Sequence, residues 1–188
     1  MRCFWLAAAV AVFAAAGCDD GKGEMFPDPA FKACVEDRIA YAVSIGLWQK
    51  DDPDIYNKVT MLECYGGGVK SIKGIEHMPN MDDLSIVDNQ IESLEPLRTL
   101  TKLEFLKLNN NKIKDLEPLS GLKMLYNLYL ADNYIEDISP LCALTQIRTV
   151  MLSGNCITDV NQFRELENCA SEYSSNGAEN YQEPAKCQ

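Results

Sequence analysis

The sequence contains little histidine, and basic residues are scarce relative to acidic ones. The 188 residues include 1 His, which leaves few options for histidine metal sites, catalytic triads or proton shuttles. Lys and Arg total 17 against 28 Asp and Glu, and this net charge of −11 argues against nucleic acid or an anionic lipid surface as the main partner. No nucleophile with a placed base is recognisable, and no cysteine pair has the close C-x-x-C type of spacing that zinc sites use. We therefore expect a protein that is not an enzyme and has no cofactor and no metal site.

The N-terminus has the pattern of a secretory signal. Met1-Arg2 is a short basic region, and the apolar run from Phe4 to Ala16 is too short to cross a bilayer as a permanent helix. Two cleavage sites fit this segment. Ala14-Ala15-Ala16 offers the small-x-small site of an ordinary signal peptidase, whereas Ala15-Ala16-Gly17-Cys18 resembles a bacterial lipobox, in which Cys18 becomes the lipidated N-terminus.

The number of cysteines favours the lipobox. Eight Cys in so short a chain indicate an oxidising compartment. If Cys3 leaves with the signal peptide and Cys18 carries lipid, an even set remains for disulfides, whereas cleavage after Ala16 leaves an odd one. The remaining cysteines are Cys34, Cys64, Cys142, Cys156, Cys169 and Cys187. We predict a signal peptide over residues 1–17, a lipidated Cys18 with a polar tether over 18–26, and a protein held by lipid in the bacterial cell envelope, facing either the periplasm or the cell surface.

A period of 22 residues organises most of the chain. The same seven positions are apolar in each of five consecutive blocks, and an Asn recurs at one position in four of them. The blocks begin at Val59, Met81, Leu103, Leu125 and Ile147, and the recurring residues are Asn89, Asn111, Asn133 and Asn155. This pattern is identified as that of leucine-rich repeats, so the expected fold class is α/β, a solenoid of five 22-residue coils over residues 59–168.

Each position of the repeat has a physical role. In the third block, Leu106 and Leu108 alternate as inward residues of a short strand, and successive strands stack into a parallel sheet on the concave face. The amide of Asn111 is placed to bond backbone groups of adjacent coils that would otherwise be buried without partners. The threefold spacing after it suits 3₁₀ turns or a short helical turn on the convex side, with Pro118 at the start of the turn.

A helical cap is expected before the first coil, over residues 27–58. Asp28-Pro29 is a helix start, with a capping carboxylate followed by Pro in the first turn. The segment from Phe26 to Val35, followed by a repeat rich in Asn-x-Ile, resembles bacterial internalin-family proteins. The resemblance covers Phe26 to Asn168 and implies a shared scaffold, but not a shared ligand.

Cysteine positions predict how the ends of the solenoid are fixed. Cys64 falls at an inward position of the first strand and Cys34 on the cap-helix face that should cover it, so we expect a Cys34–Cys64 disulfide. The other four cysteines are expected to tie down a C-terminal cap or tail over residues 169–188. Sequence does not choose among the three ways of pairing them.

The outward strand positions carry aromatic residues and Met on the concave face. Such residues are enriched in interface cores, although strands favour aromatic residues on any face. The six expected contact residues are Phe105, Lys107, Tyr129, Tyr65, Val87 and Met151. We expect a module that binds a protein, peptide or glycan there. The alternative hypothesis is a structural envelope spacer or assembly subunit. A third hypothesis is an enzyme, and no feature of the sequence favours it.

Overall fold

The computed structural model describes residues 24–169 and Cys187. The predicted signal peptide, Cys18, the tether up to residue 23 and residues 170–186 and 188 lie outside the described residues. Among the helices of the described part, none is both long and apolar enough to cross a membrane.

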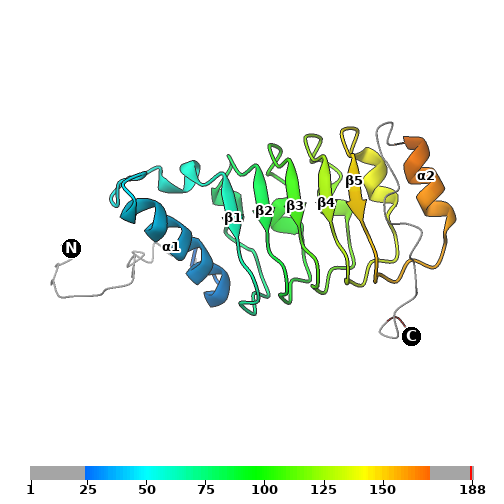
Figure 1. The fold of residues 1–188 in the computed structure, drawn as a ribbon, viewed down its shortest axis with the longest axis horizontal. Coiled ribbons are helices and arrows are strands. Elements are labelled where there is room, and N and C mark those ends of the chain that lie inside the picture. The colour runs from blue at the N-terminus through cyan, green and yellow to red at the C-terminus, as the bar shows by residue number, and fades with distance from the viewer. Residues whose placement is uncertain (1–23, 170–186, 188) are drawn as a thin grey trace.

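Five short strands lie side by side in chain order and form one parallel sheet (Figure 1). A 3₁₀ turn follows each of the first four strands on the other side of the solenoid. The strands are β1 (Met61–Glu63), β2 (Asp83–Ser85), β3 (Phe105–Lys107), β4 (Asn127–Tyr129) and β5 (Thr149–Met151). The 3₁₀ turns are η1 (Ile55–Lys58), which precedes β1, and η2 (Ile75–His77), η3 (Glu95–Leu97), η4 (Glu117–Leu119) and η5 (Ser139–Ala143). This architecture confirms the predicted leucine-rich repeat fold.

The strand register follows the sequence period. Leu106 pairs with Leu84 on one side and with Leu128 on the other, and each partner lies one repeat away. All three side chains are fully buried. Because every coil places the same positions inward, the coils share one continuous apolar core that runs the length of the sheet.

The recurring Asn residues form a buried ladder between coils. Asn111 donates through Nδ2 to the carbonyl oxygens of Ile86 and Leu108, at 2.8 and 3.0 Å, and its Oδ1 accepts from the backbone N–H of Ile91 at 3.0 Å. Asn133 and Asn155 repeat this arrangement and are completely buried. The predicted role of the Asn amides in pairing backbone groups of neighbouring coils is confirmed.

Helix α1 (Pro29–Ser44) covers the first coil, as expected for the N-terminal cap (Figure 1). The Asp28 carboxylate accepts from the N–H groups of Ala30 and Phe31 through one oxygen, and from those of Lys70 and Ser71 through the other. Burial raises the pKa of Asp28, but these four hydrogen bonds outweigh burial and hold it below the ordinary value. One side chain thus caps the helix and joins it to the first coil.

The end of the fifth coil is helical, whereas the earlier coils return through 3₁₀ turns, and the repeat pattern suits both. The chain forms the nine-residue helix α2 (Asn161–Cys169), in which Leu166 is buried and Phe163 partly buried. Val160, which occupies an apolar position of the repeat, is instead 64% exposed. The apolar pattern of the repeat ends near Asn168, and the amphipathic helix α2 covers the end of the core that the last coil would otherwise leave exposed.

Three disulfides join the ends of the described chain to the solenoid. The expected Cys34–Cys64 bond is present and links α1 to the first coil. Cys142 pairs with Cys169, joining η5 to α2, and Cys156 pairs with Cys187. The structure therefore selects one of the three pairings that the sequence left open.

Candidate ligand-binding surface

The strand register sorts the outward side chains into rows on the side of the sheet that the repeat pattern predicts to be concave. We call this side the sheet face. Its first two rows are Met61, Asp83, Phe105, Asn127 and Thr149, and Glu63, Ser85, Lys107, Tyr129 and Met151. A third row follows the strands and consists of Tyr65, Val87, Asn109, Ala131 and Ser153.

The structure brings together the three central candidates. Lys107 and Tyr129 are direct partners on β3 and β4, and Phe105 lies diagonal to Tyr129. The two ring centroids are 5.3 Å apart with the ring planes at 39°. The two rings are in tilted contact with each other, and both remain partly accessible to water.

The other three candidates lie around this pair rather than against it. Tyr65 is 57% exposed at the β1 end of the sheet, and Met151 is 37% exposed on the opposite edge strand. Val87 is half-buried in the row between Tyr65 and Asn109. The candidates therefore span the sheet face from end to end, with the aromatic pair in the middle.

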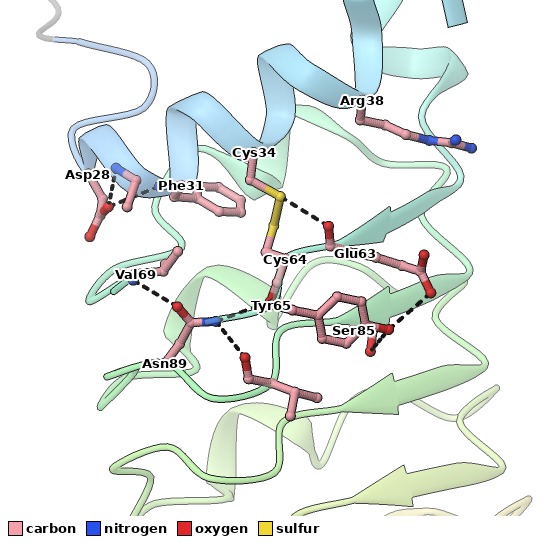
Figure 2. The surroundings of a disulfide bond; sticks show 12 residues. Asp28, Phe31, Cys34, Arg38, Glu63, Cys64, Tyr65, Val69, Ser85 and Asn89 are labelled. Carbon is pink, nitrogen blue, oxygen red and sulfur yellow. Dashed lines mark hydrogen bonds between the residues drawn. A yellow bond between two sulfur atoms is a disulfide. The ribbon is translucent and has the colours of Figure 1, made fainter. Parts of the chain in front are cut away.

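Tyr65 is fixed by polar contacts with neighbouring strands. Its hydroxyl donates to Glu63 Oε1 at 3.1 Å and lies 3.3 Å from Ser85 Oγ (Figure 2). Ser85 is only 3% exposed although it faces outward. The Tyr65 ring and the Glu63 side chain thus lie on the same side of the sheet as Ser85 and shield the Ser85 hydroxyl from water.

Carboxylates gather on the part of the sheet face nearest to α1. Glu63 and Asp83 lie on β1 and β2, and Asp82 and Glu104 immediately precede β2 and β3. Partial burial raises the pKa of Asp83, and the neighbouring carboxylates of Glu63 and Asp82 raise it further. None of the ion pairs between residues 24 and 169 involves these four carboxylates.

A pocket of about 510 Å³ lies between α1 and β1. Sequence reasoning missed it, since its walls come from two segments whose relative placement depends on helix packing. Tyr41 and Met61 give it apolar walls, together with Tyr65, and Asp37 and Glu63 contribute carboxylates. Arg38 and Cys34 also line it, from the side of the helix.

Two bonds fix the geometry of this pocket. The Cys34–Cys64 disulfide ties the middle of α1 to the end of β1 (Figure 2). One turn further along α1, Arg38 donates through Nε to the carbonyl oxygen of Met61 at 3.2 Å. The pocket is therefore a fixed part of the junction between cap and sheet. It continues into the sheet face through Met61, Glu63 and Tyr65.

Residues 24–169 contain no group of three or more His, Cys, Asp or Glu side chains arranged to hold a metal ion. A second hollow, of about 410 Å³, is lined by Glu92, Lys112, Lys114, Asp115 and Tyr134. Its residues follow the buried Asn positions and do not belong to the sheet face.

Comparisons with known proteins agree with the fold. Residues 79–121 match the family model described as leucine-rich repeats in two copies. The match and the observed architecture show that the chain has the leucine-rich repeat fold. The chain is structurally similar to an internalin (inlF) from Listeria monocytogenes, with a TM-score of 0.64 and 27% identity over 77% of this chain and 48% of that chain. The chain thus spans about half of that internalin structure.

Two further structures share the fold. One is the functional domain of InlJ from Listeria monocytogenes, with a TM-score of 0.59 and 22% identity over 73% of this chain and 30% of that chain. The other belongs to the Drosophila melanogaster SNF/U2A' complex, with a TM-score of 0.52 and 23% identity over 60% of this chain and 69% of that one. A search of the curated proteins found no significant match.

Proposed function

We propose that this protein is a non-enzymatic binding module of the bacterial cell envelope and that its sheet face contacts a protein, peptide or glycan partner. The observation that carries this proposal is the aromatic pair of Phe105 and Tyr129 on the outward side of the sheet. Met61 and Met151, at 40% and 37% exposure, extend the apolar surface to both edge strands. Apolar and aromatic groups clustered on an exposed face are typical of interaction surfaces.

The size of the sheet face limits the partner. Five strands about 4.8 Å apart, each presenting about five residues of about 3.3 Å, give an area of about 400 Å². A standard protein interface takes about 800 Å² from each partner. The sheet face alone therefore suits a peptide, a glycan or a weak protein encounter, and a tight protein partner would also contact α1.

The three disulfides indicate an extracytoplasmic protein. We propose further that lipid on Cys18 anchors it to a membrane. The six cysteines after Cys18 are all paired with one another, which supports the use of Cys18 for lipid rather than for a disulfide. The intact mass of the protein extracted from membranes tests this: a diacylglyceryl and acyl increment on a chain beginning at Cys18 is expected, and an unmodified chain beginning at Gly17 would contradict it.

Binding is tested by capture from envelope extract with three forms of the full chain. The wild type is compared with a Phe105→Asp/Tyr129→Asp variant and with Val160→Asp, which places a charge on an exposed apolar residue away from the sheet. We expect the wild type and Val160→Asp to retain the same molecule and the double variant, still folded by circular dichroism, to lose it. Equal capture by all three would refute a role for the sheet face and favour a structural role that depends on the ends of the solenoid.

A further inference from the structure

The charge on the sheet face is unevenly distributed along the solenoid. The four carboxylates of Glu63, Asp82, Asp83 and Glu104 lie on or next to β1–β3, and Lys107 is the cation on these strands. On the part formed by β4 and β5 the charged residue is Arg148, directly before β5. A ligand lying across the strands would therefore meet negative potential at the α1 end of the sheet.

The pocket between α1 and β1 lies at this acidic end. Asp37 and Glu63 bring carboxylates to it, and Arg38, the cation in its lining, donates through Nε to the Met61 carbonyl oxygen. Its apolar walls include the rings of Tyr41 and Tyr65, which are 58% and 57% exposed. An aromatic and aliphatic wall beside carboxylates suits a Lys or Arg side chain, because the long stem packs on apolar groups while the cationic head meets negative charge and π faces.

We propose that the sheet face binds an extended peptide segment that places a Lys or Arg side chain in the pocket between α1 and β1 and an apolar side chain on the Phe105–Tyr129 pair. This inference rests on the proposed function and names the class of ligand. Electrostatic complementarity selects a basic segment over an acidic one. Partial burial raises the pKa of Asp83, and the nearby carboxylates of Glu63 and Asp82 raise it further, so a positive charge placed beside Asp83 would stabilise its ionised form.

The spacing of the two subsites fixes the spacing of the two side chains. The outward side chains of β1, Met61 and Glu63, form the wall of the pocket on the side of the sheet. The aromatic pair lies between β3 and β4, about two and a half strand spacings of about 4.8 Å, or about 12 Å, from this wall. An extended chain rises about 3.3 Å per residue, and residues at even separations point to the same side. Two side chains four residues apart on one face are about 13 Å apart. The basic and apolar residues of the ligand are therefore expected at positions i and i+4.

The probe is a library of random nonapeptides displayed on phage and selected on four forms of the immobilised full chain. These are the wild type, a Glu63→Gln/Asp83→Asn variant that removes two charges with little change in shape, a Glu92→Gln/Glu136→Gln control, and the Phe105→Asp/Tyr129→Asp variant. The control makes the same change in net charge at exposed residues away from the sheet face. Thermal unfolding of each form checks that the variants remain folded.

On the wild type and the control we expect enriched peptides with Lys or Arg four residues from an aromatic or large aliphatic residue. On the Glu63→Gln/Asp83→Asn variant the preference for Lys or Arg should disappear while the apolar preference remains. A synthetic peptide from the wild-type selection should bind this variant about three- to tenfold more weakly, and its wild-type affinity should fall as salt is added.

The two proposals fail in different ways. Peptides enriched on the wild type without a basic residue, or with a basic preference that persists in Glu63→Gln/Asp83→Asn, would overturn the inference but leave the sheet face as a binding surface. If the Phe105→Asp/Tyr129→Asp variant enriches the same peptides as the wild type, or if the wild type enriches none, both the inference and a peptide-binding sheet face are refuted.

Discussion

Removing one amide of the Asn ladder should destabilise the whole solenoid, and Asn133→Ala is the clearest case. Asn133 is completely buried in the fourth coil. Its Oδ1 accepts from the backbone N–H of Ile113 at 3.1 Å, and its Nδ2 donates to the carbonyl oxygens of Leu108 and Leu130, both at 3.0 Å. The side chain therefore connects the third coil to the fourth through its bonds with Ile113 and Leu108, and its bond to Leu130 lies within the fourth coil.

The substitution would leave the three backbone groups with different numbers of hydrogen-bond partners. Leu108 O still accepts from Asn111 Nδ2, and Leu130 O from Asn155 Nδ2, so each keeps a donor. The Ile113 N–H loses the side chain that pairs it and becomes a buried donor without a partner. Leaving such a group unsatisfied costs about 1–3 kcal/mol, and weakening two further bonds adds about 0.5–1 kcal/mol each, so we expect a loss of about 2–5 kcal/mol.

Urea unfolding followed by far-ultraviolet circular dichroism, with the disulfides intact, measures this loss. Asn168→Ala is the matched control, since Asn168 is exposed on α2 and its truncation should change the free energy of unfolding by less than about 0.5 kcal/mol. If Asn133→Ala unfolds at the same urea concentration as Asn168→Ala, the argument that the amides stabilise the solenoid by pairing buried backbone groups is wrong.

Three further predictions concern the ends and turns of the solenoid. Because the pKa of Asp28 is lowered in the folded state, its carboxylate stabilises the fold fully above the ordinary carboxyl pKa of about 3.9, and this contribution is lost as pH falls through the lower folded pKa. Asp28→Asn should therefore flatten the pH dependence of the free energy of unfolding in that acidic range. An unchanged pH profile would contradict this. Gly154→Ala should lower thermal stability, because Gly154 has a φ of +72° and an added Cβ would lie 2.2 Å from Asp132 Oδ1; an unchanged melting temperature would refute the contact. Replacing the Cys34–Cys64 bond by Ala at both positions should cost about 2–4 kcal/mol and speed hydrogen exchange in the cap helix first, whereas uniform exchange along the chain would show that the bond does not act locally.

The sequence made the outward rows predictable because two periods coincide. Alternation along each strand decides which side chains face outward, and the 22-residue repeat aligns them from coil to coil. The sequence alone therefore places Phe105, Lys107 and Tyr129 together at the centre of the sheet. The Cys34–Cys64 bond was predictable for the same reason, since both residues fall on faces whose direction the local pattern sets.

The end of the fifth coil shows where periodicity misleads. Val160 is apolar at a repeat position that is buried in the earlier coils, yet it is exposed. Burial there depends on the turn that the chain makes after Asn155, and on whether a further coil follows to cover it. Helix α2 forms in place of that turn, and the repeat alone does not encode this difference.

The sequence by itself determined the solenoid, the inward core, the Asn ladder and the membership of each row on the sheet face, because these depend on short-range alternation and on one repeated length. Only the tertiary structure decided which of Cys142, Cys156, Cys169 and Cys187 pair, and how α1 lies against β1 to form the pocket lined by Asp37, Tyr41, Glu63 and Tyr65. Both depend on how non-repeating segments pack against the ends of the core. That packing is set by side-chain fit between residues far apart in the chain, which no local pattern records.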